Sequence, residues 1–102
     1  MSLKKKYLKS KPICKVSFIL PKDAVKTANK VAVVGDFNGW DSSANPMKKL
    51  KNGSFKSEID LPAGNEYQFR YLIDDKKWEN DWVADRYVPT DYGDADNSVV
   101  VV

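Results

Sequence analysis

The chain of 102 residues contains no histidine and a single cysteine, Cys14. Histidine is the commonest general base and metal ligand among side chains, so its absence removes the usual centre of a catalytic or metal site. One cysteine excludes an internal disulfide and fits a reducing compartment. Because Cys14 lies within an alternating apolar segment, we expect it to be a small core side chain and not a nucleophile.

Long hydrophobic runs are also absent. No segment approaches the roughly 20 apolar residues that a membrane-spanning helix needs. The lysine-rich start, MSLKKKYLKSKP, is not followed by the apolar stretch of roughly 7–15 residues that a signal peptide requires. We therefore expect a cytoplasmic protein with no membrane partner.

The carboxylates do not follow the spacing of a known catalytic or metal site. They gather in turns such as DD (74–75) and DYGDAD (91–96), where Asp side chains usually bond their own backbone. DADN (94–97) resembles part of a calcium loop but lacks the carboxylate at the loop end. Gly35 and Gly39 are followed by neither Lys-Ser nor Lys-Thr, which excludes a phosphate-binding loop. We expect no enzymatic activity, no cofactor and no metal.

Charge is distributed unevenly although the net charge is only +3. Six of the seventeen basic residues lie in residues 1–15, which contain no acid, whereas residues 74–96 carry eight acids and three basic residues. A nucleic-acid binder would present Lys and Arg on its folded face, so we expect no nucleic-acid partner. We predict a flexible, solvated basic tail over residues 1–12, which the fold does not need, and one domain over residues 13–102.

Alternation of apolar and polar residues, the period of a β-strand, recurs along the chain. It is clear in residues 14–20, 55–61 and 67–73, and the runs VAVV (31–34) and NSVVVV (97–102) add β-branched strands. The helical period is nearly absent, with at most one helical turn expected in PKDAVKTANK (21–30). Short strands separated by Gly, Pro, Asn and Asp turns predict an all-β, antiparallel sandwich or barrel.

All three tryptophans lie in polar, turn-rich segments and not in alternating apolar runs. Trp40 closes GDFNGW, Trp78 follows DDKK, and Trp82 lies in ENDWVAD. Each ring could fold back to cap the edge of the sandwich. For three such rings together, an exposed aromatic binding surface is an equal alternative, since exposed aromatic clusters tend to mark binding sites.

Three separated blocks of the sequence resemble one known family. VAVVGDFNGWD, LPAGNEYQFRYLIDDKKWENDW and the final NSVVVV are similar, in this order, to the glycogen-binding, early-set domain. This is carbohydrate-binding module family 48, found in AMP-activated protein kinase β subunits and at the amino ends of branching enzymes and isoamylases. The resemblance covers roughly residues 13–102. It implies an immunoglobulin-like β-sandwich that binds α-1,4-linked glucans such as glycogen or starch.

The resemblance also implies the residues of a site. Trp40 and Trp78 correspond to the family's two platforms that stack on glucose rings. Arg70 corresponds to a basic residue, and Asn97 to an asparagine, that hydrogen-bond sugar hydroxyls. Tyr92 corresponds to the large residue that reaches past a sugar ring in the kinase subunits. The turn before Trp78 has one residue more than the kinase-type D-G-x-W, and YGDADN is also longer than its counterpart.

Three functions are compatible with these features. The first is a glucan-binding module that brings a glucan-active enzyme or kinase to its polymer. The second is a protein-interaction or scaffold sandwich without sugar binding, against which the joint retention of Trp40, Arg70, Trp78 and Asn97 argues. The third, single-stranded nucleic-acid binding through aromatic rings, fits least because residues 74–96 are acidic.

Trp82 has no counterpart in the kinase-type pattern. The chain should be leaving the binding face where Trp82 occurs. We therefore expect its ring to pack against Tyr87 or the rim of the sandwich and not to bind sugar.

Overall fold

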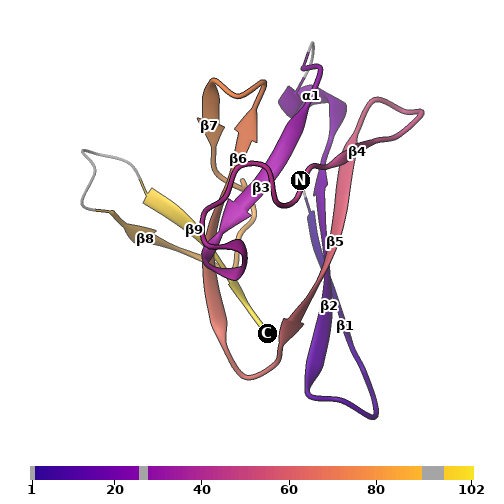
Figure 1. Cartoon of the computed structure of the whole chain (residues 1–102), viewed down its shortest axis with the longest axis vertical. Coiled ribbons are helices and arrows are strands. Elements are labelled where there is room, and N and C mark those ends of the chain that lie inside the picture. Colours follow the sequence, from indigo (N-terminus) through magenta and orange to yellow (C-terminus); the bar gives the residue numbers. More distant parts are fainter. Residues whose placement is uncertain (1, 26–27, 91–95) are drawn as a thin grey trace.

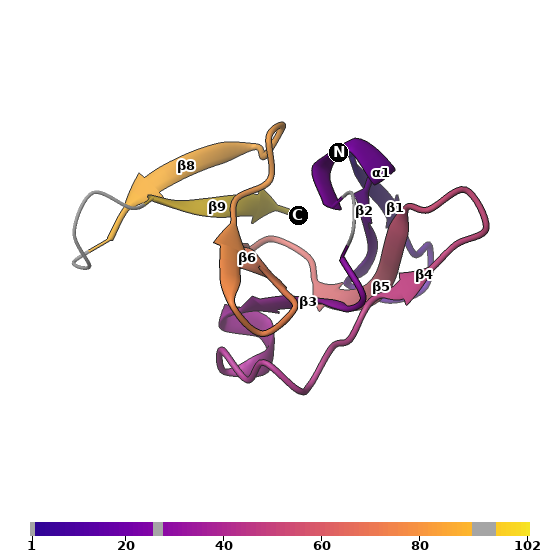
Figure 2. The same ribbon diagram turned by 90° about the horizontal axis from the view of Figure 1, so that it is seen from above.

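The computed structural model describes residues 2–25, 28–90 and 96–102 of the chain (Figure 1). In chain order the elements are β1 (Ser2–Tyr7), β2 (Ile13–Leu20), α1 (Lys22–Val25), β3 (Val31–Gly35), the 3-10 turn η1 (Asp36–Asn38), β4 (Lys48–Lys49), β5 (Phe55–Pro62), β6 (Glu66–Ile73), β7 (Lys77–Glu79), β8 (Arg86–Pro89) and β9 (Asp96–Val101). One sheet has the order β1–β2–β5–β4, and the other has the order β3–β6–β9–β8 with β7 also paired to β6. Every pairing is antiparallel, and the view from above shows the sheets as two layers (Figure 2). The expected all-β antiparallel sandwich is confirmed.

Strand β2 forms the inner face of the first sheet, as its alternation predicts. Cys14, Val16, Phe18 and Leu20 are completely buried, and the residues between them are partly exposed. β5 pairs with β2 along its whole length. Pro21 follows directly, and its missing N–H ends the ladder before the single helical turn α1.

Strand β6 divides its side chains between the core and the outer surface of the second sheet. Phe69 and Tyr71 are completely buried, whereas Gln68 and Arg70 are partly exposed on the opposite face. Phe18 of the first sheet packs edge to face on Phe69, with 5.1 Å between the ring centroids. Such aromatic pairs contribute beyond their buried area, and here they join the two sheets.

A buried carboxylate, Asp81, ties the loop after β7 to this core. Asp81 is 1% exposed and accepts a hydrogen bond from the Tyr71 hydroxyl at 2.7 Å. Its backbone N–H donates to Ser98 Oγ at 2.9 Å, and the Tyr87 hydroxyl donates to its backbone carbonyl. Burial, and after it the negative charge of Asp81, raises the pKa of Tyr71 well above the ordinary value of 10.0. Asp81 Oδ1 also accepts from the Val83 N–H at 2.9 Å, so this carboxylate bonds its own turn as well as the core.

The amino-terminal residues correct the expectation of a flexible tail over residues 1–12. Ser2–Tyr7 form β1, which pairs with β2 along its whole length. The register places Leu3 on the inner face, where it packs against the core, and Lys5 reaches Asp85 beside β8 with 2.7 Å between Nζ and Oδ2. The pairing uses backbone donors and acceptors that any strand provides, so the run of lysines does not prevent it.

Removal of residues 1–7 is therefore expected to destabilise the protein. The truncation deletes the β1–β2 ladder, the core contact of Leu3 and the Lys5–Asp85 ion pair. A loss above roughly 1 kcal/mol should lower Tm by more than about 4 °C in a domain of this size. The control replaces Lys4 and Lys6, which face outward, by Thr and should melt like the full chain. Melting followed by circular dichroism measures both, and an unchanged Tm after truncation would restore the tail interpretation.

Candidate functional site

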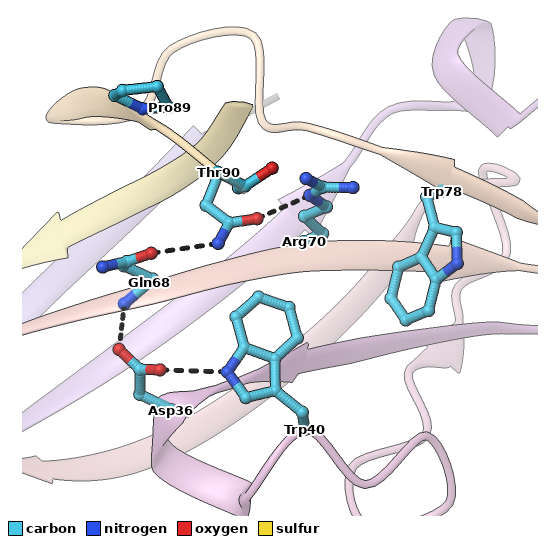
Figure 3. Close-up of a pocket in the computed structure, with 8 residues that line it drawn as sticks. Asp36, Trp40, Gln68, Arg70, Trp78, Pro89 and Thr90 are labelled. Atoms are coloured by element: carbon cyan, nitrogen blue, oxygen red, sulfur yellow. Dashed lines mark hydrogen bonds between the residues drawn. The ribbon is translucent and has the colours of Figure 1, made fainter. Parts of the chain in front are cut away.

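A groove of about 820 Å³ lies on the outer face of the second sheet (Figure 3). Side chains from the η1 loop, β6, β7, β8 and β9 converge on it. The described residues that line it are Asp36, Trp40, Gln68, Arg70, Trp78, Pro89, Thr90 and Asn97.

Strand register brings these side chains to one face. Residues that pair directly in an antiparallel sheet point to the same side, and Trp78 of β7 pairs with Leu72 of β6. Leu72 shares its face with Arg70, two residues earlier in β6. Ala32 and Val34 of β3 pair with Leu72 and Arg70, so the small buried cluster of Ala32, Val34 and Leu72 lies on this same face. A buried apolar cluster therefore lies on the same face of the sheet as the polar and aromatic groups of the groove.

Trp40 is carried by a tight loop that leaves β3. The backbones of Gly39 and Trp40 both adopt the left-handed conformation, with φ of 66° and 59°. The Trp40 N–H donates to the Gly35 carbonyl at 2.9 Å. Asn38 stabilises the loop because its Oδ1 accepts from the Gly35 N–H at 3.1 Å and its Nδ2 donates to the Val33 carbonyl at 3.0 Å. The loop thus places a large ring, 37% exposed, at the groove.

Trp78 lies on β7, just after the hairpin turn from β6. Asp74 and Asp75 in this turn are both left-handed, with φ of 52° and 57°. The Asp74 carboxylate accepts from the backbone N–H groups of Lys30 and Asn29, and these bonds, Lys30 first, lower the pKa of Asp74. These bonds attach the turn to the segment that precedes β3. The Trp78 side chain remains 46% exposed in the groove.

A hydrogen-bonded chain connects the polar groups between the two indoles. The Arg70 Nε donates to the Asn97 Oδ1 at 2.6 Å, and the Asn97 Nδ2 donates to the Gln68 Oε1 at 2.9 Å. The Gln68 backbone N–H in turn donates to Asp36 Oδ2 at 2.9 Å. Since these bonds use only Nε of Arg70, the rest of its fork of donors can serve a ligand.

The structure brings together four of the five residues that the sequence predicted for the site. Trp40, Arg70, Trp78 and Asn97 line the same groove although up to 57 positions separate them. Tyr92 lies outside the described residues. Trp82 is 54% exposed and is not among the described residues that line the groove. Its expected packing against Tyr87 stays a prediction.

Sequence reasoning missed Asp36, Gln68, Pro89 and Thr90. Gln68 was detectable, because it lies two residues before Arg70 on the same face of a predicted strand. Asp36 was not detectable from periodicity, since it belongs to a turn. Pro89 and Thr90 come from β8 and its end, a short polar segment in which no strand was predicted.

Acidic side chains are scarce in the described lining of the groove. Asp36 is the single carboxylate among the described residues that line it, and glycoside hydrolysis usually needs a pair. Within the described part of the chain, no three His, Cys, Asp or Glu side chains gather in a way that could hold a metal ion. A search of the same residues finds no helix with the length and apolar character required to span a bilayer.

Comparison with known protein families matches residues 25–102 to the family described as the glycogen recognition site of AMP-activated protein kinase. The chain belongs to this family. The match begins at the end of α1 and includes every described residue of the groove. The matched region therefore contains every strand of the second sheet, whereas β1 and β2 precede it.

Curated relatives of the matched region are 1,4-alpha-glucan branching enzymes. GlgB of Photobacterium profundum is 42% identical over 43 residues, GlgB of Pseudomonas putida 42% over 48, and GlgB 2 of Xanthomonas oryzae pv. oryzae 47% over 45. These stretches cover 41%, 44% and 41% of this chain. The chain spans only 6% of the length of each of these enzymes. The similarity therefore concerns one small part of each enzyme.

Replacing Gly35 is expected to disturb both the fold and the groove. A Cβ at this position would lie 2.4 Å from the Gln68 carbonyl oxygen and 2.7 Å from the Phe69 Cβ. Both atoms belong to β6, so Gly35→Ala should cost at least about 2 kcal/mol, as overpacking does. Gly39→Ala meets nothing within 4 Å and should cost only about 1 kcal/mol for its left-handed φ. Urea unfolding compares the two variants, and equal losses would contradict the close approach of β3 to β6.

Proposed function

We propose that the chain is a non-catalytic module that binds α-1,4-linked glucan, such as glycogen or starch, in the groove. One observation carries the proposal: two exposed indoles, those of Trp40 and Trp78, border one open space together with Arg70 and Asn97 (Figure 3). The family description names glycogen, and the relatives are named for 1,4-alpha-glucan, which supports this class of ligand.

The chemistry of a glucose unit complements these side chains. A pyranose ring has an apolar C–H face and a rim of hydroxyls. A flat indole can cover the face, while guanidinium and amide groups bond the hydroxyls. If each indole covers roughly 100 Å² of apolar surface, it contributes about 2.5 kcal/mol before ordering costs. Two rings then support a Kd in the approximate range of micromolar to millimolar for a short oligosaccharide.

A polymer should bind more tightly than an oligosaccharide. Glycogen presents many glucan chains close together, so a released module rebinds a neighbouring chain before it diffuses away. Binding of this kind would suit an adaptor, and we propose a glucan-active enzyme or a kinase as the protein partner. The family description and the branching-enzyme relatives motivate this choice.

Substitution of the indoles tests the proposal directly. Trp40→Ala and Trp78→Ala should each weaken glucan binding about thirtyfold, which corresponds to roughly 2 kcal/mol, because each removes one apolar contact surface. Both side chains are substantially exposed, so Tm should change by less than about 4 °C. Trp82→Ala is the matched control, because it removes an exposed indole outside the groove lining and should keep its affinity.

Electrophoresis in gels that contain glycogen, with a glucan-free gel as reference, measures these affinities. If the wild-type chain migrates equally in both gels, the proposed function fails and a scaffold sandwich without sugar binding becomes the better account. If only Trp82→Ala loses retardation, the ligand lies elsewhere on the surface.

Incubation with glucan tests the absence of catalysis. The chain should release no reducing sugar from glycogen, starch or pullulan, because the described residues that line the groove include one carboxylate, and Asp36 is already hydrogen-bonded to Trp40 and to the Gln68 backbone. A reducing-sugar assay on repurified protein gives the answer. Release that persists in the wild type and disappears in Asp36→Asn would contradict the proposal.

A further inference from the structure

We propose that Asp36 is a positioning residue that holds the Trp40 indole in its ligand-facing orientation. The inference rests on the proposed binding of glucan in this groove, but Asp36 itself need not touch the sugar. Its carboxylate accepts a hydrogen bond from the Trp40 Nε1–H, with 2.9 Å between Nε1 and Oδ1 (Figure 3). A bond to an ionised acceptor is stronger than one between neutral groups.

The Trp40 ring gains no support from ring–ring contacts within the described part of the chain. The residue is left-handed, with φ of 59°, a conformation that bulky side chains seldom adopt. Ring–ring contacts in the described part of the chain join Phe18, Phe37, Tyr67, Phe69 and Tyr71, and Trp40 takes part in none of them. An indole held only by its own backbone would sample several rotamers and would lose that freedom on binding.

Two different side chains of the loop hold its backbone and the Trp40 ring. Asn38 bonds the Gly35 N–H, the Val33 carbonyl and the Asn45 side chain, so it fixes the path of the main chain. Asp36 bonds the indole. A substitution at Asp36 can therefore release the ring while the loop stays folded.

The second oxygen of Asp36 bonds the strand that carries the polar groups of the site. Oδ2 accepts from the backbone N–H of Gln68 at 2.9 Å, and the Gln68 side chain accepts from Asn97, which holds Arg70. The carboxylate thus contacts both the indole and the strand that carries the polar donors. Each of the two N–H groups bonds a different oxygen of this carboxylate. Asp36 accordingly fixes the distance between the stacking surface and the hydroxyl-binding groups.

The experiment compares Asp36→Ala with Asp41→Ala. Asp41 lies in the same loop and carries the same charge, but its carboxylate accepts hydrogen bonds from the N–H and the hydroxyl of Ser43. Asp36→Ala should weaken binding to maltoheptaose about tenfold, measured by titration calorimetry, and Asp41→Ala should change it less than about twofold. In proton–nitrogen spectra without sugar, the Trp40 indole N–H should exchange with solvent faster in Asp36→Ala, while the Trp78 indole N–H should not change.

A double-mutant cycle with Trp40→Phe separates positioning from a structural role of Asp36. Phenylalanine keeps an aromatic face but has no indole N–H, so adding Asp36→Ala to Trp40→Phe should change affinity less than about twofold. A tenfold loss in that background, or unchanged indole exchange in Asp36→Ala, would overturn the inference. These outcomes differ from failure of the proposed function, in which the wild-type chain itself does not bind maltoheptaose.

Discussion

Strict alternation along β6 is the constraint on which the site depends. Phe69 and Tyr71 face the core and are completely buried, while Gln68 and Arg70 between them face the groove. A shift of one residue in the pairing of β6 would send Arg70 into the core and a tyrosine to the surface, and burial of an unpaired guanidinium opposes that strongly. The packing of Phe18 against Phe69 therefore also sets where the polar groups of the groove lie. In this way the core of the sandwich determines the geometry of its outer face.

The two indoles lie beside this strand, each just after a turn: Trp40 closes the loop after β3, and Trp78 lies on β7 after the hairpin turn from β6. Each turn contains two left-handed residues, and in each a side chain satisfies backbone groups of neighbouring segments: Asn38 before Trp40, and Asp74 before Trp78. Left-handed non-glycine residues persist only where the surroundings support them, and they often occur at binding sites. A site built from such turns loses little conformational freedom when a ligand binds, which favours affinity from a small contact area. That property suits the glycogen-recognition family, to which the chain belongs.

Period-two patterns predicted the strands that lie in the centre of the sheets, because one face of each is buried and its sequence must alternate. The same reasoning placed Arg70 outward, and motif resemblance selected the two indoles and Asn97 that line the groove with it. Residues 1–12 were misread because Lys5, on the inner face of β1, bonds Asp85 at the rim of the sandwich, so the inner face is not purely apolar. The bond from Tyr71 to Asp81 was not predictable from the sequence, since the two residues are ten positions apart and only the fold brings them together. Strands such as β7 and β8 are too short to show an alternation of apolar and polar residues. They form because they pair with neighbouring strands in the sheet.

The central claim is that the outer face of the second sheet recognises α-1,4-linked glucose units. Chemical-shift mapping of the full chain with maltoheptaose, and in parallel with a β-1,4-linked cello-oligosaccharide, tests it most directly. The account predicts that the indole N–H signals of Trp40 and Trp78, together with the backbone signals of Arg70 and Asn97, shift in a saturable manner with the α-linked sugar alone. The Trp82 indole signal should stay in place. Shifts that cluster on the outer face of the first sheet, or equal responses to both sugars, would contradict the account.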